Sequence, residues 1–301
     1  MPAIVASTAP PELGEARSPL LVRLCVMVLA PVAVAVIVTC QSQAQWLGTS
    51  EAMRRSISAT VPSTIAAYSE TELVGLPAPV ARYFRSVLRD GQAIIRQADV
   101  TWSGQFNMGK AGRDRWVPFT ATQLFVPGTR EFVWDARMAL APGLPVLVSD
   151  SFIDGTGAMH AAIFGLIRLV DVAGTADLAR GELLRFLGEA VWLPTALLPS
   201  QGVHWSPIDD NSARATISGG GVAVSAEYRF ADDGSIASLS SKERLFDDGE
   251  SPPSIHPWGG TYRRYEERNG VRVPMESEVH WDLPGGRFTY WRGTPTQIAY
   301  R

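Results

Sequence analysis

Residues 262–282 read YRRYEERNGVRVPMESEVHWD, with the dipeptide Asn269-Gly270 at the centre. Asn-Gly accepts the positive φ angles of a two-residue turn, so it is the strongest short-range signal for a β-hairpin. The residues on both sides follow the two-residue period of strands. The stretch therefore predicts two antiparallel strands, 262–268 and 271–282.

The same strand period extends outward from this hairpin to most of the chain after about Ile94. Runs typical of strands alternate with turn signals such as Pro127-Gly128 and Asp154-Gly155. Few helical segments separate the runs, which favours an antiparallel meander of about ten to twelve strands. Residues 158–170 fit either a strand or a strand followed by a helical turn. The other expected strands cover 94–106, 116–126, 131–138, 144–153, 202–205, 213–218, 222–230, 235–245, 288–291 and 296–300.

Two segments have the helical period instead, residues 79–88 and 176–192. Thr175 is placed to cap the second helix, and Arg185 and Glu189 are i,i+4 partners opposite its apolar face. Each helix has an apolar face that must cover something, and a sheet of this size curls by its own twist. The expected fold class is mainly β (α+β), a large curved antiparallel sheet or half-barrel covered on its concave face by one or two helices.

A membrane-directed segment precedes this body at residues 20–40, where Arg23 is the one charged residue. The span suits a transmembrane helix. Arg17 and Arg23 lie at its N-terminal end and no charge follows it until Glu51, which favours a cytoplasmic N-terminus. A retained signal anchor, a cleaved secretory signal and a lipoprotein signal ending at Cys40 remain as alternatives, and all three place the body outside the cytoplasm.

This segment divides the chain into four expected regions. Residues 1–19 are a disordered cytoplasmic tail, and residues 20–40 are the transmembrane or signal segment. Residues 41–74 are a juxtamembrane tether that is partly helical, and residues 75–301 are the half-barrel domain.

Composition excludes several classes of protein. The chain has 27 basic and 30 acidic residues and a net charge of −3. This charge argues against a nucleic-acid-binding protein, because the phosphates of a nucleic acid require a basic surface. Cys25 and Cys40 are the two cysteines. The body therefore has no disulfide framework, no cysteine-based metal site and no cysteine nucleophile. The absence of a phosphate-binding loop also leads us to expect no cofactor.

Three strings together resemble a known family: LPAPVARYF at 76–84, GELLRFLGEAVWLPTALLP at 181–199, and the closing hairpin at 270–281. They are similar to a family of uncharacterised bacterial proteins, a domain of unknown function that typically follows one N-terminal membrane segment. Its order of strands and helices resembles that of the lipoprotein-carrier half-barrels, the periplasmic carriers and their mycobacterial lipid-binding relatives. The resemblance implies a single-pass protein of the bacterial inner membrane with its domain in the periplasm.

No catalytic motif is present, and we assign no catalytic or metal-ligating residue. The four histidines have no metal-ligand spacing: His160, His204, His256 and His280. The candidate ligand-binding residues are an acid and aromatic side chains that would lie between the second helix and the sheet. They are Glu189, Trp192, Phe186, Trp134 and Trp281.

Glu189 has two interpretations. It is a polar anchor for a ligand headgroup or a proton-handling acid, or else it forms an ion pair with Arg185, Arg137 or Arg168. The ion pair is favoured, because structural ion pairs are the commoner reason for a buried acid.

The sequence is compatible with three functions. The first is a membrane-anchored extracytoplasmic, non-enzymatic domain that binds a lipid or another hydrophobic ligand. The second is a single-span accessory or structural subunit that docks on a larger membrane protein complex, and the third is an enzyme built around Glu189 or Asp150. A continuous apolar tunnel between helix and sheet would favour the first, and a filled core would favour the second.

Overall fold

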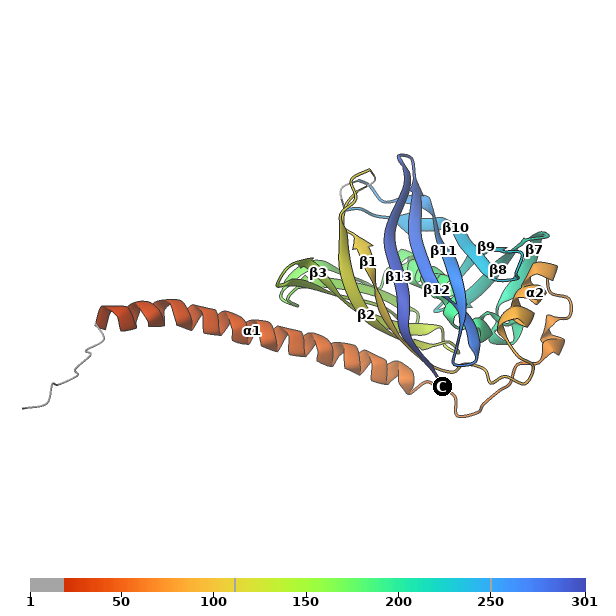
Figure 1. The fold of residues 1–301 in the computed structure, drawn as a ribbon, viewed down its shortest axis with the longest axis horizontal. Coiled ribbons are helices and arrows are strands. Elements are labelled where there is room, and N and C mark those ends of the chain that lie inside the picture. Colours follow the sequence, from red (N-terminus) through yellow and green to blue (C-terminus); the bar gives the residue numbers. More distant parts are fainter. Residues whose placement is uncertain (1–18, 111, 250) are drawn as a thin grey trace, which may run out of the picture.

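The structure, a computed structural model, describes residues 19–110, 112–249 and 251–301. Within these residues thirteen strands form one antiparallel sheet, in the order β6-β5-β4-β3-β2-β1-β13-β12-β11-β10-β9-β8-β7 (Figure 1). The strands are β1 Ala98–Asn107, β2 Trp116–Val126, β3 Glu131–Ala141, β4 Leu144–Ile153, β5 Thr156–Ile163, β6 Ile167–Ala173, β7 His204–Asp209, β8 Ser212–Gly219, β9 Val222–Phe230, β10 Ile236–Phe246, β11 Ser254–Arg268, β12 Val271–Leu283 and β13 Gly286–Tyr300.

The mainly β fold and the curved antiparallel sheet are as predicted, and two details differ. Residues 158–170 belong to a hairpin of β5 and β6, turned by Phe164 and Gly165 in the positive-φ region. Residues 288–300 belong to a single strand, β13, where two were expected. Pro295 is tolerated inside it because it lies opposite a register shift in β1, where the regular ladder is interrupted.

Two helices precede the sheet in the chain, and a third connects strands β6 and β7. They are α1 Pro19–Ser58, α2 Ala78–Val87 and α3 Ala176–Glu189, with 3-10 turns η1 Glu70–Leu73, η2 Ala190–Trp192, η3 Pro194–Leu197 and η4 Pro199–Gln201. Thr175 caps α3 as expected, its hydroxyl accepting from the Leu178 amide at 3.1 Å. Because α3 leads from edge strand β6 to the opposite edge strand β7, it crosses the concave face, contacting β4 and β5 on one side and β9 and β10 on the other.

The space between α3 and the sheet is filled by side chains. Leu183, Leu187 and Val191 have exposed fractions of 0%, and Phe186 has 2%. A cavity large enough to admit water beside these side chains would leave part of their surfaces exposed, so they are enclosed by their neighbours without such a cavity. Gly157 of β5 permits this close packing, because a Cβ there would lie 2.9 Å from the backbone of α3.

The two halves of the sheet also contact each other directly. The β4–β5 turn and the β8–β9 turn touch through Gly155 and Gly220, where a Cβ on either would lie within 2.4 Å of the other's Cα. Both glycines have positive φ, which no other residue adopts as readily. This contact explains the glycine at the centre of Gly219-Gly220-Gly221.

The C-terminal half of α1 packs on the convex face of the sheet, and its N-terminal half projects away from the domain (Figure 1). Ser50 Oγ donates to Asp135 Oδ1 at 2.5 Å, and Arg54 forms an ion pair with Asp135 at 3.1 Å. Ile57 lies in a small second core with residues of β2 and β3. The segment 41–74, expected to be a tether, therefore begins as helix fixed to the domain.

The structure addresses only part of what the sequence predicts for the N-terminal region. The predicted tail 1–19 lies outside the described residues apart from Pro19, where α1 begins. In the part of the chain that the structure describes, no helix combines the length and the apolar character needed to cross a membrane.

Truncating Leu187 tests the filled interior. Because this side chain is fully buried between α3 and the sheet, Leu187→Ala is expected to lower the free energy of unfolding by about 2–5 kcal/mol. Urea unfolding of the full chain in mild detergent, followed by tryptophan fluorescence, measures this. The matched control Val74→Ala, at a side chain that is 85% exposed, is expected to change it by about 0.5 kcal/mol or less. Equal effects would contradict the packed interior.

Candidate functional site on α3

A cluster of charged side chains surrounds Arg185, near the middle of α3. Its guanidinium donates to Asp150 Oδ2 of β4 (2.5 Å) and to Glu189 Oε1 (2.9 Å), and Glu182 Oε2 lies 3.7 Å from Arg185 Nη1. Helical spacing brings Glu182, Arg185 and Glu189 to one face of α3. That face, expected to be the polar side of an amphipathic helix, points at β4 and is enclosed by the sheet.

A hydrogen-bonded chain ties this cluster to the neighbouring strands. Glu189 Oε2 accepts from Gln123 Nε2 of β2 at 2.7 Å, and Gln123 Oε1 accepts from Trp102 Nε1 of β1 at 3.1 Å. Every oxygen of the Glu189 carboxylate thus has a partner. The ion-pair interpretation of Glu189 is confirmed, with Arg185 as its cation.

Aromatic rings flank the two arginines of the interior. The Arg185 guanidinium lies over Phe132 and Trp134, at 5.1 and 5.0 Å from the ring centroids. Arg244 of β10 lies over Trp258 and Trp281 in the same way, at 4.4 and 5.6 Å. Such stacking stabilises a cation by about 0.5–2 kcal/mol when water is partly excluded.

Burial dominates the ionisation of the acids. It raises the pKa of Glu182 to about 7, although Arg185 acts in the opposite direction. Burial likewise raises the pKa of Asp150, partly offset by the Arg185 charge and hydrogen bond. Burial alone would lower the pKa of Arg185, but Glu189, Asp150 and Glu182 reverse this and raise it, so Arg185 stays charged.

The cluster is not fully satisfied. Within the described residues, Asp150 Oδ1 and Glu182 Oε2 are buried without a hydrogen-bond donor, and so is Arg244 Nη1 without an acceptor. Three carboxylates lie around Arg185, yet no group of acids, histidines and cysteines in the described part of the chain could hold a metal ion. The arrangement suits a structural ion cluster that can take up one proton at Glu182.

The five predicted ligand-binding residues do not form one site. Glu189 and Trp134 meet at Arg185. Phe186 packs on Phe125, with ring centroids 6.5 Å apart, elsewhere on α3.

The other two predicted residues lie farther along the interior. Trp192 is buried edge-on against Trp102 and donates to the Pro274 carbonyl at 2.8 Å. Trp281 stacks with Phe246 in another part of the sheet. All are packed among other side chains, so they serve the core in this structure.

The sequence patterns did not identify Glu182 and Arg244 as members of the charged interior. Glu182 precedes Arg185 by three residues, a spacing that could have identified it. Arg244 lies in β10, and no local signal shows which strand residues face the helix from across the sheet.

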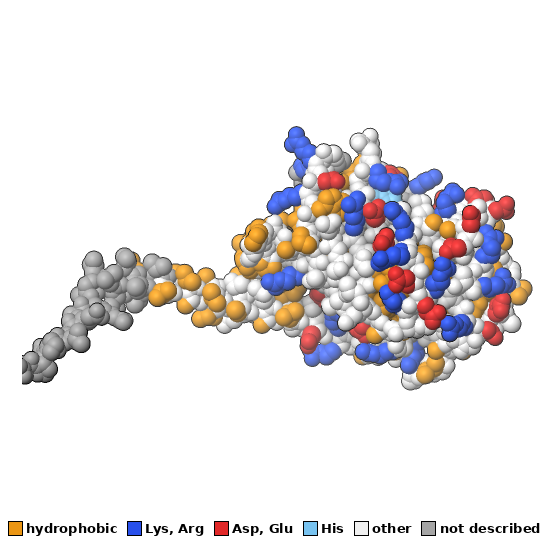
Figure 2. Space-filling view, viewed as in Figure 1, with side chains coloured by type: hydrophobic (Ala, Val, Ile, Leu, Met, Phe, Trp, Pro, Cys, Tyr) orange, Lys and Arg blue, Asp and Glu red, His pale blue; other side chains and the backbone are white. Residues whose placement is uncertain are grey.

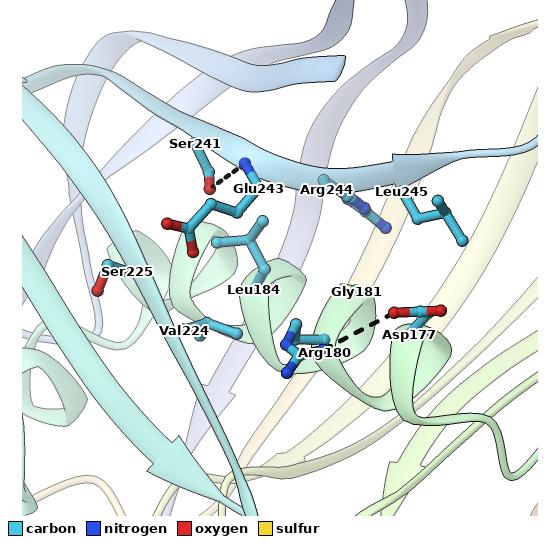
Figure 3. Close-up of a pocket in the computed structure, with 10 residues that line it drawn as sticks. All are labelled: Asp177, Arg180, Gly181, Leu184, Val224, Ser225, Ser241, Glu243, Arg244 and Leu245. Carbon is cyan, nitrogen blue, oxygen red and sulfur yellow. Dashed lines mark hydrogen bonds and ion pairs between the residues drawn. The ribbon is translucent and has the colours of Figure 1, made fainter. Parts of the chain in front are cut away.

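A small gap beside Arg244 is lined by the residues that Figure 3 shows. It lies between Arg180, Gly181 and Leu184 of α3 and residues of β9 and β10, and its volume is about 10 Å³. That volume admits about one water molecule. Among the described residues, the side chains of α3 that face the sheet are buried, and the gap beside them is too small for the apolar tunnel that would favour an enclosed ligand.

An open apolar depression lies instead at the ends of β2, β3 and β4. Its volume is about 280 Å³, and its lining includes Pro118, Phe119, Met138, Leu144 and Pro145. Two other depressions, of about 260 and 190 Å³, are lined mainly by charged and polar residues of the strands. Apolar lining distinguishes the first as a surface for a hydrophobic group.

A curved antiparallel sheet with a helix across its concave face defines a half-barrel domain of the α+β type. The chain belongs to a family of unknown function, DUF6544, whose model matches residues 66–293. The predicted resemblance to a family of unknown function is thus confirmed. No curated protein matches the chain. A solved LolA superfamily protein from Nitrosomonas europaea is similar over 74% of this chain and 92% of its own, at 9% identity and a TM-score of 0.39.

The raised pKa of Glu182 gives stability a pH dependence of known sign. The folded state holds the Glu182 proton up to about pH 7, whereas an unfolded glutamate releases it near its ordinary pKa of 4.5. This contribution to stability is therefore fully present below pH 4.5 and is lost as the pH rises through about 7. Glu182→Gln, which keeps a neutral side chain, is expected to stabilise the protein more at pH 8 than at pH 5, by about 2.5 kcal/mol. Denaturant unfolding at both pH values measures the difference, and an equal effect would contradict the assignment.

Proposed function

We propose that the protein is a membrane-anchored, extracytoplasmic, non-enzymatic domain that binds a lipid or another hydrophobic ligand. The observation that carries the proposal is the open apolar depression at the ends of β2, β3 and β4. A volume of about 280 Å³ accommodates part of an acyl chain or one small apolar group, at the low end of ligand sites in proteins.

Membrane anchoring rests on the sequence of residues 20–40 and on the character of α1. Leu29, Val34 and Ile37 expose 55–63% of their surface on the projecting half of the helix. Such side chains are stable in a bilayer and unfavourable in water. Arg17 and Arg23 on the N-terminal flank support an orientation with the domain on the periplasmic side of a bacterial inner membrane.

Because side chains fill the interior of the half-barrel, the proposed ligand binds in an open surface depression and not in an enclosed cavity. A soluble carrier must shield a whole acyl chain from water, and an open depression shields only part of it. The proposed ligand therefore stays in contact with the membrane while the domain holds it. The charged cluster supports a non-enzymatic role, because Arg185 already pairs with Asp150 and Glu189, and the carboxylate oxygens of Asp150 and Glu182 that lack a donor are buried.

Filling the depression tests the proposal. Ala141 is an exposed residue of its lining, and Ala141→Asp would place a carboxylate beside the apolar side chains. We expect this variant to weaken binding of a fluorescent phosphatidylglycerol probe in detergent by about tenfold or more, since the carboxylate repels the anionic headgroup and would lose water on contact with the acyl chain. Ala223→Asp, on the exposed side of β9, is the matched control and is expected to bind as the unaltered protein does. Unchanged binding by Ala141→Asp would contradict the proposed site.

A second function is favoured by a separate observation. Edge strand β6 exposes Ile167, Leu169 and Val172 by 44–61%, and the core behind it is filled. An unpaired apolar edge is a template on which a partner can add a strand. This supports an accessory or structural subunit that docks on a larger membrane protein complex.

Mass spectrometry of an organic extract of the purified full chain separates the two functions. The first predicts a recurring lipid in mild detergent that is lost on extensive delipidation, because the depression is open. Repeated preparations without any lipid, together with stable association of a membrane protein, would favour the docking function and contradict the first.

A further inference from the structure

Two hairpin tips beside α1 carry no charged side chain. The β3–β4 tip, residues 140–144, reads LAPGL, and the β5–β6 tip, residues 163–167, reads IFGLI. Leu166 and Ile167 expose 42% and 61% of their surface. Apolar side chains presented together on a turn are unfavourable in water and mark a contact surface.

Other turns of the same sheet have the opposite character. The β7–β8 turn contains Asp209-Asp210, and the β9–β10 turn contains Asp232-Asp233. These turns are solvated in the ordinary way, with acidic side chains bonded to nearby backbone amides. The apolar composition of the two tips is therefore a local feature and not a property of the whole domain.

Contacts with α1 fix the position of both tips. Ser42 Oγ donates to the Gly165 carbonyl at 2.6 Å, inside the β5–β6 tip. Arg137 Nη1 donates to Gln43 Oε1 at 3.3 Å, three residues before the β3–β4 tip. Both tips thus lie beside α1 at the level of residues 42–43, immediately after the predicted membrane segment 20–40.

The apolar surface continues from the tips onto the projecting helix. Figure 2 shows hydrophobic side chains along α1 and on the end of the domain from which α1 projects. Val36, Ile37 and Val38 expose 41–56% of their surface one to two helical turns before the contacts at Ser42 and Gln43. The helix and the two tips therefore present apolar side chains at the same end of the domain.

Basic residues lie at the borders of this surface. Arg137 is exposed before the first tip. Arg168 directly follows the second tip, and its side chain is 79% exposed although it forms an ion pair with Asp171 at 2.8 Å. Arginines beside an apolar surface match the anionic headgroups that border the hydrocarbon of a bilayer. The charges thus favour a lipid surface over an apolar protein partner.

We infer that residues 140–144 and 163–167 are seated in the interface of the membrane that holds α1, with acyl chains and anionic headgroups as their partner. This inference rests on the membrane anchoring proposed above and deepens it by naming the surface of the domain that meets the lipid. Leu144 belongs both to the first tip and to the apolar depression. Seating the tips therefore places the depression at the membrane surface, where its lipid ligand is present.

Depth-dependent quenching tests the inference on the full chain. Cys25 and Cys40 are replaced by serine, and single cysteines are introduced by Pro142→Cys and Leu166→Cys for labelling with the environment-sensitive fluorophore NBD. The labelled chain is placed in vesicles of phosphatidylethanolamine and phosphatidylglycerol that carry a spin label either near the headgroup or near the bilayer centre. Both tip positions are expected to shift their emission to the blue and to lose more of it to the shallow spin label than to the deep one.

Two further positions separate the possible failures. Val34→Cys, on the projecting half of α1, reports membrane insertion, and its emission is expected to fall most with the deep spin label. Asp232→Cys, in the β9–β10 turn, is the control and is expected to lose no emission to either. Loss at position 34 without loss at 142 and 166 would overturn this inference and leave the anchor intact, and would point to a protein partner for the tips. No loss at position 34 would overturn the anchor and, with it, this inference.

Discussion

One constraint governs this molecule: a wide antiparallel sheet must bury its apolar concave face. One connection of the chain crosses that face and can cover it. The connection from β6 to β7 has to pass from one free edge to the other, and α3 is that connection. Hydrophobic burial therefore draws the helix into the half-barrel, where Leu183 and Leu187 lose all contact with water. The packed interior and the open site at the strand ends both follow from this.

Placing a helix inside a sheet encloses its polar face as well as its apolar one. Glu182 and Arg185 would lie in water on a surface helix, but here they face β4 and need partners from the sheet. Asp150 supplies one, and the Phe132 and Trp134 rings supply a surface for the guanidinium. Buried ion pairs add little net stability because of desolvation, but they penalise any other rotation of the helix. The cluster thus fixes how α3 sits in the half-barrel.

Much of the architecture was predictable because antiparallel hairpins are encoded locally. Asn269-Gly270 specifies its turn within a few residues, and Thr175 and Pro194 delimit the helical region in the same way. The Arg185–Glu189 pair was predictable from helical spacing. Contacts between segments that are distant in the sequence could not be predicted. Nothing near Asp150 in the sequence shows that β4 faces α3.

The same limit applies to the docked part of α1 and to the ligand surface. Ser50 and Arg54 read as residues of a polar tether, because their partner Asp135 lies in β3, more than 80 positions away. The tryptophans named as ligand contacts were chosen by residue type, and type does not distinguish a cavity wall from a filled core. The apolar depression, formed where three strands end, had no sequence signal of its own.

The contact of Gly155 with Gly220 closes the half-barrel diagonally. Successive hairpins of an antiparallel sheet alternate between its two ends, so the β4–β5 turn lies at the end opposite to the β3–β4 and β5–β6 tips, whereas the β8–β9 turn lies at the same end as these tips. The twist of the sheet brings these two turns together, and neither glycine has a side chain that would keep them apart. Any widening of the half-barrel would therefore have to separate this contact between its two halves.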